Sequence, residues 1–486
     1  MTPLRHRRLI DRLLAGILAI VVVGIGLLVY RASDIQNTSL VVSNPSNAPP
    51  GAWSAASVPS PNTAIPRSLT QKWSAPTDPA LGAVASASGV VLTTEASTVR
   101  ARDAVTGVER WSYSRANRTL CAVGSADLGP SDMASSASVA GLTTVFSENG
   151  FCSQVMTFDP VNGERGKVRT SANQGVGSLV FGGSYAAWLG PTRIEVWRYD
   201  LVRTIQYGVQ ANPPKPGQSR LDCTFTDLAV ASNQFATVEH CTNEKNARVV
   251  LNFDDPSSVA GHPDGWDNFQ HAVRVDIDTK AAAARIVGVS ADRVAVLVSG
   301  PKPAVVVYDA VGKEASRTPV DVPAADVVAA DSPARPAVAT PSVQTQDRRY
   351  SLVGGSVLSV SQATISVVPP PTSFSSSASS SSSTGVGKSG LLTGLTGPKT
   401  VDTADLHVDW VAGNALGLPA TIDATILLPT ARGLATFDSV AGPGALGTTG
   451  SKIVTVDRSG YTGRVDATAV GRMIIEERGP TVVGLG

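Results

Sequence analysis

One short pattern recurs along the chain and restricts the fold more than any other feature. A β-branched run leads into an Asp-containing turn that ends in Gly, and a second run often follows. The fullest copy is VRARDAVTGVERWSYS at residues 99–114, and weaker copies lie at 155–169, 305–317, 434–442 and 454–460. Alternation directs one face inward, the Asp side chain bonds the turn backbone, and Gly adopts a positive φ. The pattern predicts β-hairpins along the chain.

The spacing of these hairpins predicts a ring of similar units. The turn aspartates are at positions 103, 159, 200, 309 and 438, and a further strand precedes several copies. A unit of about 40 residues with four short strands is typical of a propeller blade. The 45 Gly, 32 Pro and 5% aromatic residues also favour many turns over long helices. We therefore expect an all-β fold, a β-propeller of about seven (six to eight) four-stranded blades preceded by one N-terminal transmembrane helix.

The fullest copy resembles the repeat of quinoprotein-type (PQQ-like) β-propellers. That repeat runs as a strand, Asp-Ala-x-Thr-Gly, an acidic residue and then a Trp that packs between blades. QVMTFDPVNGER resembles the same repeat without the Trp. The residues that carry the resemblance are Asp103, Thr106, Gly107, Trp111, Asp159 and Gly163. The chain is also similar to membrane-anchored propellers of actinobacteria.

The resemblance implies one of two functions. Some members of the family are dehydrogenases that hold pyrroloquinoline quinone, and others are cofactor-free scaffolds of the cell envelope. The dehydrogenases need a Ca²⁺ site, a catalytic Asp and usually a vicinal disulfide, whereas no two cysteines are adjacent here. Asp276 and Asp278 offer oxygens for calcium, but this spacing on a strand is more often a solvated edge. We expect the cofactor-free branch, with no catalytic, cofactor-binding or metal-binding residues, and no enzyme activity.

Two other catalytic signatures are incomplete. GVGKSG at 385–390 resembles a phosphate-binding loop, but Ser382 occupies the place of its first Gly. A hydrolase needs a base beside its nucleophile, and no Ser lies in a G-x-S-x-G turn. The candidate bases are four histidines of the exported part, which are expected to be surface or turn residues. These are His240, His262, His271 and His407.

The N-terminus predicts a membrane anchor. Four arginines precede an uncharged apolar run at 13–30, and this run is long enough to cross a bilayer. Since the arginines lie before the run, residues 1–12 are expected in the cytoplasm. The alternative is a cleaved signal peptide, although YRASD offers no small-x-small cleavage site. We expect a single-pass protein of the bacterial plasma membrane.

The remainder of the chain is expected outside the cytoplasm. Residues 31–70, rich in Pro and Ser, are interpreted as a tether, and residues 71–486 as the propeller. A second Pro- and Ser-rich segment at about 368–399 is interpreted as a disordered insertion within it.

Four cysteines lie in the exported part: Cys121, Cys152, Cys223 and Cys241. Four cysteines permit three pairings, and sequence proximity favours Cys121–Cys152 and Cys223–Cys241. The alternative is a metal site built from Cys223, His240, Cys241 and His262. No standard zinc spacing is present, and an oxidising compartment favours disulfides.

The charge and the local composition of the sequence indicate which classes of partner to expect. A net charge of +1 argues against nucleic acid. Trp266 lies in the polar segment HPDGWDNF, where an exposed partner contact is expected. Our leading hypothesis is a non-catalytic, membrane-tethered scaffold that binds envelope proteins. The alternatives are a ligand- or saccharide-binding sensor and a quinone-dependent oxidoreductase.

Overall fold

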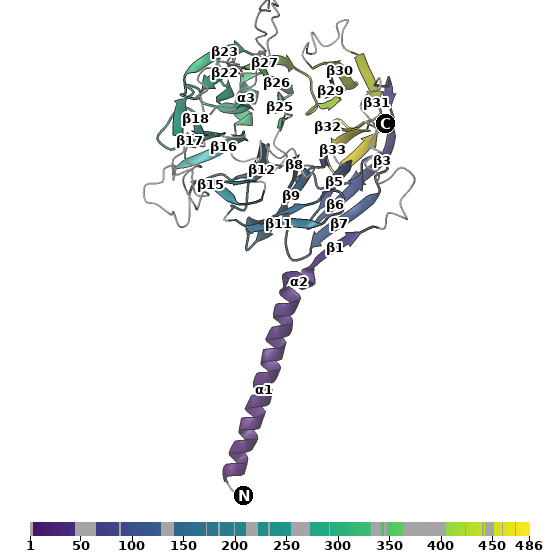
Figure 1. Ribbon diagram of the computed structural model, residues 1–486, viewed down its shortest axis with the longest axis vertical. Coiled ribbons are helices and arrows are strands. Elements are labelled where there is room, and N and C mark those ends of the chain that lie inside the picture. The colour runs from purple at the N-terminus through teal and green to yellow at the C-terminus, as the bar shows by residue number, and fades with distance from the viewer. Residues whose placement is uncertain are drawn as a thin grey trace, which may run out of the picture.

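The protein is an eight-bladed β-propeller with one long N-terminal helix (Figure 1). The computed structural model describes residues 3–43, 65–86, 89–127, 140–171, 173–182, 185–198, 200–209, 222–231, 234–253, 273–290, 292–331, 342–344, 348–363, 405–422, 424–439, 442, 452–458, 460–471 and 473–486. Eight sheets of four or five strands are arranged in a ring. The sequence prediction of six to eight blades is confirmed, at the upper end of its range.

The first four blades are numbered in chain order. Blade 1 contains β4 (Val84–Ser86), β5 (Val90–Glu95), β6 (Thr98–Asp103), β7 (Glu109–Arg115) and the added β1 (Thr38–Val42). Blade 2 contains β8 (Leu120–Asp127), β9 (Ala140–Glu148), β10 (Phe151–Phe158) and β11 (Arg165–Thr170). Blade 3 contains β12 (Ser178–Gly182), β13 (Tyr185–Leu189), β14 (Arg193–Arg198) and β15 (Arg203–Gly208). Blade 4 contains β16 (Cys223–Val230), β17 (Gln234–Cys241), β18 (Arg248–Phe253) and β19 (Val273–Asp278).

The other four blades complete the ring. Blade 5 contains β20 (Ala284–Val289), β21 (Arg293–Val298), β22 (Ala304–Asp309) and β23 (Glu314–Pro319). Blade 6 contains β24 (Ser342–Gln344), β25 (Arg348–Val353), β26 (Ser356–Ala363) and β27 (Asp405–Ala412). Blade 7 contains β28 (Ala420–Ile422), β29 (Thr425–Thr430), β30 (Gly433–Asp438), β31 (Lys452–Val456) and β2 (Ser68–Leu69). Blade 8 contains β32 (Val465–Val470), β33 (Met473–Arg478), β34 (Thr481–Leu485) and β3 (Gln71–Pro76).

Burial follows the place of each strand within its blade. Strands such as β20 and β22 are buried along nearly their whole length, because neighbouring blades cover both faces of a sheet. Their sequences are therefore near-continuous apolar runs instead of strict alternations. The outer strands β11 and β23 are almost fully exposed and correspondingly polar. This contrast explains why the inner strands are easier to recognise in the sequence.

The hydrophobic core is divided among the seams between blades. Each of the eight main buried clusters joins side chains from two consecutive blades. The short helix α3 (Ala324–Ala330) follows blade 5 and packs on β20 and β25. Because no single blade buries its own faces, stability depends on the ring being complete.

The ring closes by combining the two ends of the chain in one sheet. The outer strand of blade 8 is β3, which pairs antiparallel with β34 near the C-terminus. The β2 strand pairs in parallel with β31 in blade 7, and β1 pairs antiparallel with β7 in blade 1. The N-terminal strands therefore support three consecutive blades.

The helix α1 (Pro3–Ala32) projects from the rim of the propeller (Figure 1). Its segment Asp11–Ala32 has 22 residues and a mean hydropathy of 2.8, so it is long and apolar enough to cross a membrane. This segment contains the predicted span of 13–30.

Within the range 31–70, interpreted from the sequence as a tether, the described residues include short elements of secondary structure. The short helix α2 (Asp34–Asn37) follows α1, and β1 and β2 also fall within this range. The β-branched sequence TSLVV suits β1 for pairing with the outer edge of β7, where backbone groups would otherwise lack partners. The insertion at 368–399 lies outside the described residues.

Candidate functional site

The turn of the fullest repeat is built around the carboxylate of Asp103. Its Oδ1 accepts hydrogen bonds from the backbone N–H groups of Val105 and Thr106, at 3.1 and 2.9 Å, and from the Thr106 hydroxyl at 2.9 Å. Gly107 has a φ of 72°. Asp103 Oδ2 also lies 2.7 Å from Nη2 of buried Arg110, an ion pair that the repeat pattern did not indicate. Asp103 therefore stabilises the turn by hydrogen bonds and also forms a buried ion pair.

Trp111 of blade 1 packs against the next turn of this kind, in blade 2. Its Nε1 donates to the Pro160 carbonyl at 2.9 Å, directly after Asp159. Its ring covers Gly163, where an added Cβ would lie 2.7 Å from the indole. Gly163 is required both for its φ of 73° and for this close approach.

Two more tryptophans make the same contact. Trp73 Nε1 donates to the Ala104 carbonyl at 2.9 Å, and a Cβ on Gly107 would lie 2.6 Å from its ring. Trp410 Nε1 donates to the Ser439 carbonyl at 3.1 Å. The sequence indicated packing for these side chains but not their partner turns, because each partner belongs to the following blade.

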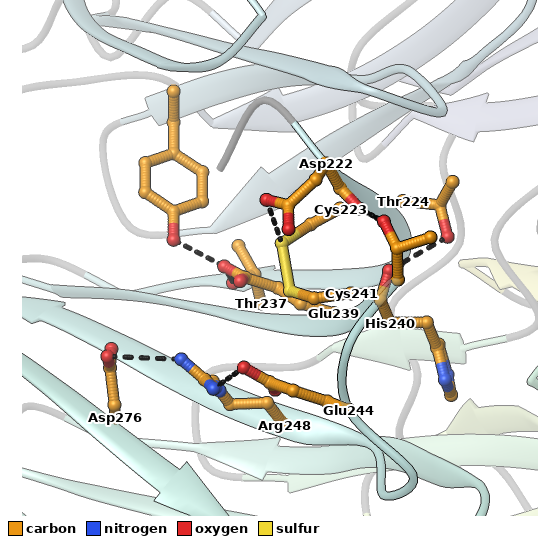
Figure 2. The surroundings of a disulfide bond; sticks show 12 residues. Asp222, Cys223, Thr224, Thr237, Glu239, His240, Cys241, Glu244, Arg248 and Asp276 are labelled. Atoms are coloured by element: carbon orange, nitrogen blue, oxygen red, sulfur yellow. Dashed lines mark hydrogen bonds and ion pairs between the residues drawn. A yellow bond between two sulfur atoms is a disulfide. The ribbon is translucent and has the colours of Figure 1, made fainter. Parts of the chain in front are cut away.

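Both disulfides are present in the favoured pairing. Cys121–Cys152 joins β8 and β10, with Cα atoms 5.9 Å apart. Cys223–Cys241 joins directly opposed residues of β16 and β17, with Cα atoms 4.0 Å apart (Figure 2). Disulfides persist in oxidising compartments, so together with the apolar helix they indicate an exported or envelope protein.

The alternative metal site is only partly assembled. The Cys223 and Cys241 sulfurs and a Glu239 carboxylate oxygen lie within 4.8 Å of one another. The sulfurs are bonded to each other, and Glu239 accepts a hydrogen bond from the Thr237 hydroxyl at 3.0 Å. His240 points away from the disulfide (Figure 2), and His262 lies outside the described residues. The arrangement is that of a disulfide with a buried acidic neighbour.

His240 instead connects blade 4 to the end of α3. Its Nε2 lies 2.9 Å from Asp331 Oδ2, and this hydrogen bond raises the pKa of His240. Asp331 also accepts from the Ala284 N–H at 2.7 Å and from the Thr226 hydroxyl. One carboxylate therefore joins blade 4, blade 5 and α3.

A second charged group lies in the same seam. Asp227 Oδ2 lies 3.2 Å from Arg285 Nε and accepts from the Ile286 N–H at 2.8 Å. Arg285 donates to the Ala330 carbonyl of α3 at 2.9 Å. Arg349 is also buried close by, and burial lowers its pKa. These groups were not identified from the sequence, since nothing local marks them as partners.

Ser361, His407 and Asp409 meet on adjacent strands of blade 6. Ser361 Oγ donates to Asp409 Oδ1 at 2.7 Å and lies 3.4 Å from His407 Nε2. The same His407 nitrogen lies 3.1 Å from Asp409. In a hydrolase triad the acid and the nucleophile contact opposite ring nitrogens, whereas here both contact one nitrogen. The arrangement therefore differs from that of a Ser-His-Asp triad.

The acidic pair Asp276 and Asp278 lies on outer strand β19. Asp276 is paired with Arg274 at 2.8 Å and with Arg248 at 3.3 Å, and Asp278 accepts from the Lys280 N–H at 2.8 Å. A pocket of 190 Å³ lies beside them, lined by Glu244, Lys245, Asn246, Ala247, Arg248 and Asp278. Its volume is below the usual range for ligand pockets.

One carboxyl group at the seam of blades 8 and 1 has a strongly shifted pKa. Burial raises the pKa of Glu477 to about 7, and nearby Asp466 acts in the same direction. The Ala83 N–H donates to Glu477 at 3.0 Å and partly opposes the shift. Trp266, the predicted partner contact, lies outside the described residues.

Comparison with known proteins finds structural similarity at low sequence identity. No family model and no curated protein matches the sequence. The structure is similar to the computationally designed protein Ika8, at 11% identity and TM-score 0.43, covering 86% of this chain and 98% of that one. It is similar to BamB from Moraxella catarrhalis, at 13% identity and TM-score 0.37, covering 86% and 97%. It is also similar to Sqt1 from Saccharomyces cerevisiae, at 9% identity and TM-score 0.45, covering 86% and 98%.

Proposed function

We propose that this protein is a single-pass protein of the bacterial plasma membrane whose exported propeller is a non-catalytic scaffold for envelope proteins. The observation that carries the proposal is the direct attachment of an apolar 22-residue helix to a disulfide-bonded propeller. Arginines before the helix favour a cytoplasmic N-terminus. Propellers present broad faces on a rigid ring, which suits partner binding more than local chemistry.

The chemistry of the described residues supports the non-enzymatic part of the proposal. Ser361 and Asp409 contact the same imidazole nitrogen of His407, whereas in a hydrolase triad the nucleophile and the acid contact opposite nitrogens. The two disulfides join residues far apart in sequence, unlike the vicinal pair of quinone-dependent relatives. The alternatives remain a saccharide sensor and a quinone-dependent oxidoreductase.

Affinity capture of the full chain from membranes tests the scaffold. The control is residues 1–43 fused to an unrelated exported domain, so that only the propeller differs. We expect the same envelope proteins to be recovered reproducibly with the full chain and not with the control. Equal recovery from both proteins, together with a rise in melting temperature on adding cell-wall fragments, would instead favour the sensor.

A further inference from the structure

The connection between α1 and the propeller is short and held by hydrogen bonds. Ser33 donates from its hydroxyl to the Tyr30 carbonyl at 2.6 Å, and Asn37 Nδ2 donates to the Arg31 carbonyl at 2.7 Å. The Ala116 N–H donates to the Asn37 carbonyl at 2.8 Å, which ties α2 to blade 1. Only α2 and Ser33 separate the end of α1 from β1. The chain therefore enters the propeller directly from the helix.

Asp34 strengthens this junction through charge. Its carboxylate lies 2.6 Å from Nη2 of Arg115 in blade 1 and 2.9 Å from Nη2 of Arg118 in the link to blade 2. Arg118 also pairs with Glu148, at 3.0 Å, beside the β9–β10 hairpin. These pairs hold the pKa of Asp34 well below its usual range, with the hydrogen bond from Arg118 as the largest cause. Both blades are thereby fixed relative to α1.

Exposed apolar side chains gather near this junction. Outside α1, twelve large apolar side chains are exposed in the described part of the chain, and eight belong to residues 35–42, to blade 2 or to the link after it. We name six of these eight the juxtamembrane patch: Ile35, Leu40, Val42, Phe151, Val168 and Val176. Ile35 is 83% exposed on α2, and Phe151 is 55% exposed on the hairpin that Arg118 contacts. Val176 follows Gly175, which packs against the Gly150 carbonyl of that hairpin.

Basic side chains lie on β11, the outer strand of blade 2. Arg165 and Lys167 are exposed on β11, on either side of a residue that has no side chain. In Figure 1, β11 and β1 are on the part of the rim nearest to α2. Apolar groups beside basic groups are the combination that binds the surface of an anionic bilayer.

From this arrangement we infer that blades 1 and 2 rest edge-on against the bilayer, with the juxtamembrane patch in the interfacial layer and Arg165 and Lys167 on anionic headgroups. The inference rests on the proposed membrane anchor, because α1 brings the patch to the lipid. We expect a lipid bilayer to cover the juxtamembrane patch, because the patch directly follows the apolar helix α1. The propeller is thus held on its edge, and both of its faces remain open to the envelope.

Photo-cross-linking of the full chain in lipid nanodiscs tests the inference. The photoreactive residue p-benzoylphenylalanine replaces Phe151, or Val311 as the matched control, which is 76% exposed on the β22–β23 turn of blade 5. We expect lipid adducts at Phe151 to exceed those at Val311 several-fold by mass spectrometry. Equal adduct levels, or cross-links from Phe151 to a second copy of the chain, would overturn the inference.

Two further arms separate the possible failures. The same probe at Ile20 reports whether α1 itself lies in lipid, so adducts at Ile20 without adducts at Phe151 reject only the edge-on placement. Absence of adducts at Ile20 rejects the anchor as well.

The paired changes Arg165→Gln and Lys167→Gln should abolish any preference of Phe151 adducts for phosphatidylglycerol over phosphatidylcholine. The control pair Lys302→Gln and Lys313→Gln on blade 5 should leave that preference unchanged.

Discussion

Blades 8, 1 and 2 are joined differently from blades 4, 5 and 6. In the first region a tryptophan of one blade covers a turn glycine of the next, as Trp73 does to Gly107 and Trp111 to Gly163. In the second region Val275 occupies the place of the indole against Gly312, and buried charges around Asp227 and Asp331 complete the seam. The same ring geometry is therefore maintained by two kinds of contact, one repeated and one specific to its place.

The turn aspartates give the largest expected difference between the regions. Asp103 in blade 1 is buried and paired with Arg110, whereas Asp309 in blade 5 is partly exposed and bonds only its own turn in the described contacts. Removing one partner of a buried ion pair costs about 3–5 kcal/mol, so Asp103→Ala should reduce the free energy of unfolding by that amount. Asp309→Ala should cost about 1 kcal/mol. Equal losses in denaturant titrations would show that the Arg110 pair contributes nothing.

The glycine contacts give the next largest effect. Gly107→Val introduces a β-branched side chain at a φ of 72° and forces Trp73 from its position, at a total cost of about 3 kcal/mol. Gly460 has a similar φ of 79° with open space around its Cβ position, so Gly460→Val should cost only the backbone strain, about 1–2 kcal/mol. The difference in melting temperature between the two variants measures the tryptophan contact. If both variants melt together, the indole does not hold blade 8 to blade 1.

The smallest effect is on the pH dependence of stability. The folded pKa of Glu477 is about 7 against an ordinary 4.5, so the folded state binds a proton that the unfolded state has lost. The stabilisation that the protonated Glu477 carboxyl contributes is complete below its ordinary pKa and is lost as pH rises through 7. We expect a loss on the order of 1–3 kcal/mol between about pH 5 and 8.

Two variants assign this pH dependence to its groups. Glu477→Gln should flatten the profile of melting temperature against pH. His240 also has a raised pKa and acts in the same direction, but its side chain is 32% exposed, so His240→Gln should flatten the profile less. A steeper dependence after Glu477→Gln would contradict a raised pKa for this carboxyl in the folded state.

The regular region was the part predictable from the sequence. The Asp103 and Asp159 turns and the Cys121–Cys152 disulfide follow from local patterns or short spacings, and outside this region so does the Cys223–Cys241 disulfide of blade 4. The contacts of Asp331 with His240 and Ala284 could not be predicted, because they join residues far apart in sequence and α3 follows no repeat. The strand β1 was also missed, since its pairing with β7 is favoured only once the edge of blade 1 exists.

Ring closure by β3 has a consequence for biogenesis. Thr70 hydrogen-bonds to the carbonyl of Gly486 across 416 residues of sequence, so β3 cannot complete blade 8 until β34 has been synthesised. At about 5–20 residues per second of synthesis, that interval is roughly 20–80 s. During this time β2 and β3 lack their partner strands β31 and β34, and such unpaired edges are prone to wrong pairing. The nascent chain therefore needs protection of β2 and β3 from wrong pairing until β31 and β34 have been synthesised.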